Sequence, residues 1–114
     1  MGDRETRAAE ILRRLLEEGQ TLEKAAVEGS RVPSGYNPGP EGGDMPNHPD
    51  ALGWYVSVLA IMRREFGEAD THCTAFVRAG DVWPHSLLSF RQLLALLRAT
   101  TRDLREGWVT LRDD

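Results

Sequence analysis

Hydrophobic residues recur at every third or fourth position through most of this chain, which is the spacing of amphipathic helices. The first such segment spans residues 4–28, with arginines and glutamates between its apolar positions. Gly19 lies in the middle of it, and glycine costs about 1 kcal/mol relative to alanine inside a helix. The pattern therefore predicts either one continuous helix over residues 4–28 or a break into two helices at Gly19. The apolar positions are Ala8, Ile11, Leu12, Leu15, Leu22 and Ala26.

Two more helices are predicted in the middle of the chain. The first begins at Pro49 or Asp50, because proline suits the opening turn of a helix, and it ends at Phe66 before Gly67. Its broad apolar band indicates contact with more than one neighbouring helix. The second is shorter and extends from residue 70 or 71 to about 78. Its expected inward-facing residues are Cys73, Phe76 and Val77.

The last long helix is predicted to follow Pro84 and to end at Gly107. One row of apolar residues forms its core stripe, and a second row adds Leu88, Leu93 and Leu96. Residues 108–114 are expected to form an extended tail, because a single short strand there has no evident partner. The core stripe consists of Leu87, Phe90, Leu94, Leu97, Thr101 and Leu104.

Residues 29–49 hold five glycines and five prolines, which disfavour any regular element. This long Gly/Pro-rich loop serves either as a flexible connector or as a partner-binding segment with Tyr36 and Met45 as apolar anchors. The predicted fold class is therefore all-α. We expect a small bundle of four to five helices in a single domain that spans residues 1–114.

Charge and composition narrow the range of partners. The chain has 14 basic and 18 acidic side chains, so its formal net charge is −4. Nucleic-acid binders usually carry a basic surplus, and Pro33 with Gly35 would disrupt the second helix of a helix-turn-helix in residues 21–35. No apolar run reaches the roughly 18 residues of a membrane span, and the charged N-terminus does not resemble a signal peptide. The single cysteine excludes a disulfide scaffold. These features predict a cytoplasmic protein.

Candidate chemistry is sparse. His72 and Cys73 are adjacent, so on a helix they point about 100° apart and rarely share one metal ion. The paired Cys and His motifs of zinc sites are absent from the sequence, as are a phosphate-binding glycine loop and a recognisable nucleophile context. We therefore predict no metal, no cofactor and no catalytic residue.

One spacing supplies an enzymatic alternative. Arg78 and His85 form the pattern R-x6-H, which resembles the motif of HEPN-type ribonucleases. The resemblance implies that the histidine acts on the ribose hydroxyl while the arginine steadies phosphate charge. Ala79 stands where that motif favours a polar residue, and Gly80 and Pro84 interrupt the spacing.

A longer resemblance lies in two stretches. The first is WYVSVLAIMRREFG at residues 54–67, followed by EADTHCTAF, and the second is LLALLRATTRDLREGW at residues 93–108. Together they resemble the helical N-terminal module of uncharacterised bacterial proteins associated with phage defence and abortive infection. The resemblance implies a helical fold and a place in a defence system, but it supplies no catalytic residue.

The favoured hypothesis is a non-enzymatic protein–protein interaction module that binds a protein partner or a second copy of itself. Its basis is the number of large apolar side chains for so small a fold, since apolar surface left over after folding marks an interface. On this hypothesis, replacing Leu93 and Leu96 by Glu leaves a folded monomer. The predicted interface residues are Trp83, Leu88, Leu93, Leu96 and Trp108.

Overall fold

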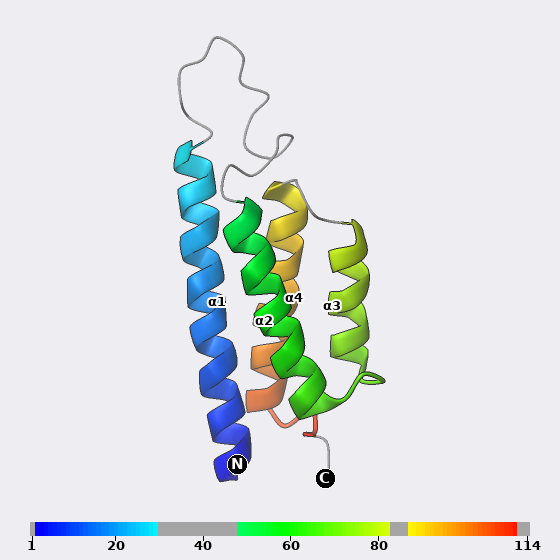
Figure 1. The fold of residues 1–114 in the computed structure, drawn as a ribbon. Coiled ribbons are helices and arrows are strands. Elements are labelled where there is room, and N and C mark those ends of the chain that lie inside the picture. Colours follow the sequence, from blue (N-terminus) through cyan, green and yellow to red (C-terminus); the bar gives the residue numbers. More distant parts are fainter. Residues whose placement is uncertain (1, 30–47, 83–86, 112–114) are drawn as a thin grey trace.

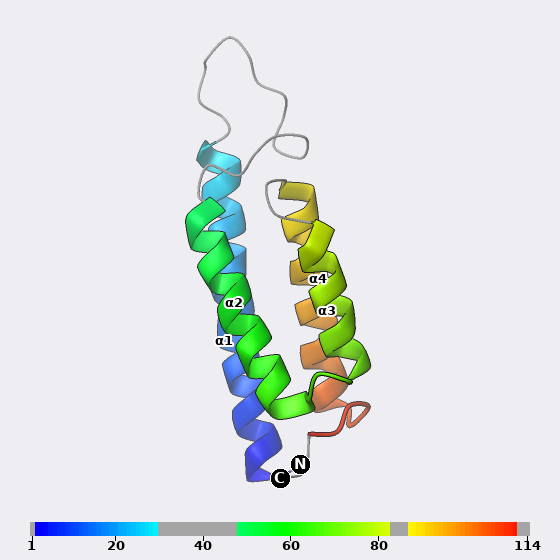
Figure 2. The ribbon, with the colours of Figure 1, turned by 45° about the vertical axis from the view of Figure 1, so that its right-hand side comes forward.

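The computed structural model describes residues 2–29, 48–82 and 87–111, and these form four helices that run alternately up and down (Figures 1 and 2). The all-α prediction is confirmed. In chain order the helices are α1 (Asp3–Gly29), α2 (His48–Phe66), α3 (Thr71–Val82) and α4 (Leu87–Arg105).

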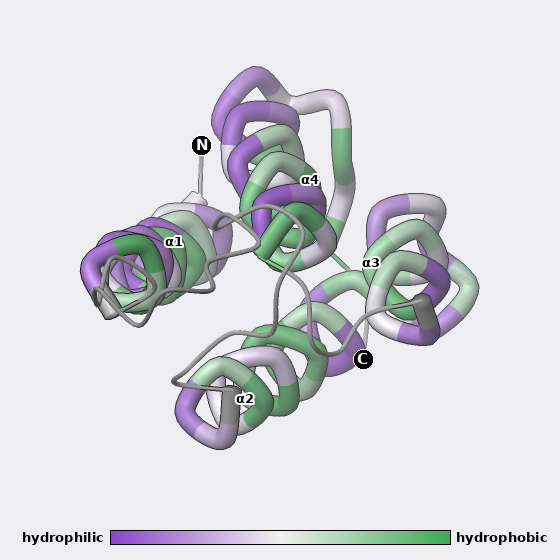
Figure 3. The backbone as a smooth tube through the Cα atoms, turned by 90° about the horizontal axis from the view of Figure 1, so that it is seen from above, coloured by the Kyte–Doolittle hydropathy of each residue, from purple (hydrophilic) through white to green (hydrophobic). Residues whose placement is uncertain are grey.

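The helices form a ring in which each one packs against two neighbours. Seen from above in Figure 3, α1 lies opposite α3, and α2 lies opposite α4. The most extensive contact is between α1 and α4, while α2 packs against both α1 and α3. The apolar stripes of all four helices therefore meet in one core.

Trp54 occupies the middle of that core. Its ring lies 5.0 Å from Phe90 of α4 and 6.2 Å from Phe76 of α3, measured between ring centroids. Its indole N–H donates a hydrogen bond of 2.6 Å to the backbone carbonyl of Leu15 in α1. One side chain of α2 thus contacts the other three helices, with its only polar atom satisfied.

Of the two alternatives at Gly19, the structure has the continuous helix, because α1 extends without interruption from Asp3 to Gly29. A Cβ atom at Gly19 would lie 2.5 Å from a methyl carbon of Leu94 and 2.8 Å from the Trp54 ring. The bare backbone at this position lets α2 and α4 approach α1 closely. This packing offsets the helix-propensity penalty of glycine.

The helix ends follow local capping rules. Gly67 (φ 90°) ends α2, as predicted, and its N–H donates to the carbonyl of Arg63. Asp70 caps α3, since its carboxylate accepts the backbone N–H groups of His72 (2.8 Å) and Cys73 (3.4 Å).

The last two helices differ in how well their ends were predicted. The expected end of α3 near residue 78 is too early, because the helix continues through Gly80, which lies against the Tyr55 ring. Gly107 (φ 80°) terminates α4 as predicted, in a Schellman arrangement in which the Trp108 N–H donates to the Asp103 carbonyl at 2.8 Å.

The described part of the segment after α4, residues 108–111, forms neither helix nor strand and has a bend at Val109. Val109 and Leu111 are buried in the hydrophobic core, and the segment that carries them lies at the lower end of the bundle in Figure 1. Of the predicted loop at residues 29–49, Gly29 and residues 48–49 belong to helices. The remainder, with Tyr36 and Met45, lies outside the described residues.

Candidate functional site

The predicted interface on α4 does not form one surface. Leu93 is 0% exposed and belongs to the core, so its assignment to an interface is wrong. Leu96 is partly buried against the core. Leu88 (51% exposed) and Trp108 (69% exposed) are at the surface but lie at opposite ends of α4, and Trp83 lies outside the described residues. Because α4 has helices on two sides, most of its second leucine row is covered.

An exposed apolar surface does exist, but it lies on α2. Leu52 is 44% exposed and Val56 is 58% exposed, one turn apart on this helix. No charged residue occurs between positions 51 and 62, although half of the helix surface there faces away from the core. We call this surface the α2 outer face; its residues are Pro49, Leu52, Gly53, Val56, Ser57 and Ala60.

The outward surfaces of α1 and α4 differ from it. Exposed positions on α1 are mostly arginine and glutamate, and Arg98, Arg102 and Arg105 lie on the outside of α4. A helix that is apolar on all sides normally has neighbours on all sides. One signal for this surface was present in the sequence, as the broad apolar band of the helix predicted to begin at Pro49 or Asp50 and to end at Phe66. In the structure α1 and α3 cover only part of that band.

A hollow of about 400 Å³ continues the α2 outer face toward α1. Gly53 has no atom within 4 Å of the position that a Cβ would take, so the backbone of α2 is open to an approaching group. Acidic side chains from two helices stand at its rim. The residues that line the hollow are Glu18, Thr21, Leu22, Asp50, Gly53, Trp54 and Ser57.

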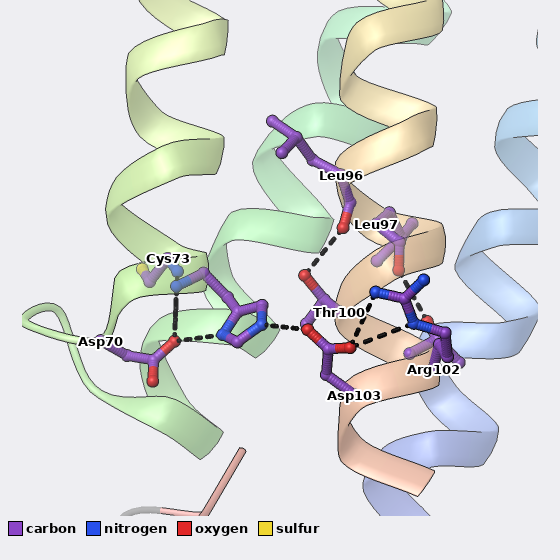
Figure 4. A network of polar contacts seen from close by, with 9 residues as sticks. Asp70, Cys73, Leu96, Leu97, Thr100, Arg102 and Asp103 are labelled. Carbon is purple, nitrogen blue, oxygen red and sulfur yellow. Dashed lines mark hydrogen bonds and ion pairs between the residues drawn. The ribbon is translucent and has the colours of Figure 1, made fainter. Parts of the chain in front are cut away.

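The best-defined polar cluster joins α3 to α4. Asp70 and Asp103, labelled in Figure 4, flank the imidazole of His72, whose Nε2 lies 2.7 Å from Asp103 and whose Nδ1 lies 3.3 Å from Asp70. Asp103 also accepts two hydrogen bonds of 3.1 Å from the Arg102 guanidinium. The hydrogen bond from His72, then that from Arg102, holds the pKa of the Asp103 carboxyl below its usual value.

This cluster lacks the features of a catalytic centre. The neighbouring Cys73 is buried, and burial raises the pKa of its thiol, which is the reverse of what an attacking thiolate needs. Within residues 2–29, 48–82 and 87–111, no group of three His, Cys, Asp or Glu side chains is arranged to hold a metal ion. The geometry is that of an interhelical connection.

The ribonuclease alternative depends on Arg78 and His85, and of these the structure describes Arg78 alone. Arg78 is exposed on α3, where it lines a surface hollow with Leu96 of α4. The other described residues that line this hollow are Ala69, Thr71, Thr74 and Ala75. His85 lies outside the described residues, so the pair stays a prediction.

Comparison of the chain with known protein families, with characterised proteins and with solved structures found no match. In the described part of the chain, no helix combines the length and the hydropathy needed to cross a bilayer.

Proposed function

We propose that this protein is a protein–protein interaction module that binds through the α2 outer face. The observation that carries the proposal is an uncharged helix surface with Leu52 and Val56 about half exposed, on a bundle in which α1 and the second half of α4 are charged on the outside. Covering such a surface removes apolar area from water, and each Å² of apolar area buried contributes about 25 cal/mol of favourable free energy.

The expected setting is the cytoplasm, as an adaptor or accessory component of a bacterial defence system. The support for this setting is the resemblance of residues 54–76 and 93–108 to modules of phage-defence proteins. The first of these stretches includes Val56, Ser57 and Ala60, which are half of the α2 outer face. The net charge of −4 favours a protein partner over a nucleic acid.

Site-specific photocrosslinking in cells that express the protein tests the proposal. A photoreactive residue at Ser57, on the α2 outer face, is compared with one at Arg14, an exposed position on the charged side of α1. We expect a discrete protein adduct from position 57 that is absent from position 14 and is lost when Val56→Arg is added. Equal adduct patterns from both positions would contradict the proposal.

A further inference from the structure

We infer that the partner of the α2 outer face is a second copy of this chain, paired antiparallel through α2 about a two-fold axis. This inference rests on the proposed function, since it names the partner for the same surface. It follows from the order of side chains along α2. When a second copy of α2 runs in the opposite direction, its side chains and end charges complement those of the first.

The side chains of two antiparallel copies fit together along the middle of α2. With the two-fold axis between Val56 and Ser57, Val56 of one copy lies level with Ser57 of the other, and Gly53 lies level with Ala60. Valine thus meets the smaller serine and glycine meets alanine, while Leu52 lies level with the partly buried Ile61. The open space at Gly53 allows the two helix backbones to approach closely, and the distance between packed helices depends on such contact residues.

The charges at the two ends of α2 are also complementary. Asp50 lies in the first turn of α2, while Arg63 and Arg64 lie in its last turn. Antiparallel pairing about the same axis places Asp50 of each copy level with Arg63 of the other and one residue from Arg64, at both ends of the contact. Glu18, which lines the same hollow as Asp50, adds negative charge at the end that receives Arg64.

Parallel pairing of the same surface would be unfavourable. It would place Asp50 beside its own copy at one end and arginines beside arginines at the other, and it would align the two helix dipoles. The antiparallel arrangement opposes the dipoles as well as the charges. A two-fold interface needs one patch that is complementary to itself, and an acidic end, an uncharged middle and a basic end satisfy that need.

An exchange of charge between positions 50 and 64 tests the pairing. Asp50→Arg alone places two arginine side chains against each other, and Arg64→Asp alone places two aspartates against each other, so each variant repels itself at both ends of the contact. In an equimolar mixture of the two variants, one copy carries arginine at both positions and the other carries aspartate at both, so a heterodimer joins opposite charges at both ends in either orientation. The mixture therefore does not distinguish antiparallel from parallel pairing, whereas a single chain that carries both substitutions does.

The informative comparison is thus between each single variant and the double variant Asp50→Arg, Arg64→Asp, in which both ends of the antiparallel contact again join opposite charges. We expect each single variant to show a dimer dissociation constant raised by about tenfold or more, and the double variant to recover most of the wild-type affinity. In a parallel pair the double variant would keep like charges together at both ends and would recover nothing.

Sedimentation velocity over a wide range of protein concentrations gives these constants, with circular dichroism to confirm that each variant is folded. A wild-type chain that stays monomeric throughout, or a double variant that associates no better than the single ones, overturns the inference. The crosslinking from Ser57 separates the two proposals. An adduct of two copies supports both, and an adduct with a different protein supports the binding surface while overturning the self-pairing.

Discussion

At the scale of single residues, two glycines that both lie inside helices have opposite surroundings. Gly19 in α1 is enclosed by Leu94 and Trp54, whereas Gly53 in α2 faces open space. A glycine in a helix lowers stability relative to alanine unless something needs the missing Cβ. Packing needs it at Gly19, and nothing within the described fold needs it at Gly53.

We therefore expect Gly19→Ala to lower the free energy of unfolding by about 1–3 kcal/mol, because the new methyl group collides with the packed core. The matched variant Gly53→Ala should raise it by up to about 1 kcal/mol through helix propensity. Urea unfolding of dilute samples measures both. Equal effects of the two substitutions would show that α1 does not pack as closely as described.

At the scale of elements, contacts between neighbouring helices decide which face of a helix is buried. Leu93 and Leu88 belong to the same leucine row of α4, yet Leu93 is enclosed and Leu88 is half exposed near the start of the helix. The His72–Asp103 contact then fixes the lower part of α3 against α4.

Leu93→Glu places a carboxylate in the core, so we expect a loss of at least about 3 kcal/mol and an unfolded or molten chain. Leu88→Glu should change the free energy of unfolding by no more than about 0.5 kcal/mol. Thermal unfolding followed by circular dichroism distinguishes them. A folded, cooperative Leu93→Glu variant would restore the hypothesis that this row is an interface.

The Asp103 carboxylate gives the α3–α4 connection a dependence on pH. Its folded-state pKa lies below the ordinary value of 3.8, so the stability that it contributes is complete above that value and is lost as the pH falls through the folded-state pKa. Asp103→Asn should therefore be less stable than wild type at pH 7, with the difference shrinking as the pH falls below 3.8.

Urea unfolding at a series of pH values measures this difference. The control is Glu106→Gln, which removes an exposed carboxylate just beyond α4. Its free energy of unfolding should change with pH in the same way as that of wild type. A stability difference between Asp103→Asn and wild type that stays constant into strongly acidic solution would show that the carboxylate takes no part in the connection.

At the scale of the whole molecule, the chain beyond α4 completes the core. Val109 and Leu111 are buried at the end of the bundle, while Trp108 between α4 and this pair remains exposed, 5.9 Å from the Arg102 guanidinium. Burial of two aliphatic side chains matters in a domain of this size, because small domains bury a smaller share of their surface.

The double variant Val109→Ser, Leu111→Ser should lose about 3 kcal/mol of unfolding free energy, since it removes two apolar side chains from the core. Trp108→Ser should lose less than about 1 kcal/mol, the size of an exposed cation–π contact. Thermal unfolding compares them. A larger loss from Trp108→Ser would mean that the tail is held by its tryptophan and not by the buried pair.

Much of the fold was predictable from the sequence because its signals are local. The apolar spacing indicated all four helices, Gly67 and Gly107 marked two of their ends, and the start of α3 was predicted within one residue. These features depend on backbone geometry and on hydrogen bonds between residues close in the chain, so each can be assessed from a short window.

The candidate site was less predictable, because exposure is a property of the assembled bundle. Apolar periodicity alone could not say that Leu93 is covered by neighbouring helices while Val56 has no helix in front of it. Nor could it say that Gly19 is a packing position. The sequence by itself determined where helices form and end, because those preferences are local. Only the tertiary structure decided which apolar faces are satisfied within the chain, because burial depends on which helices become neighbours.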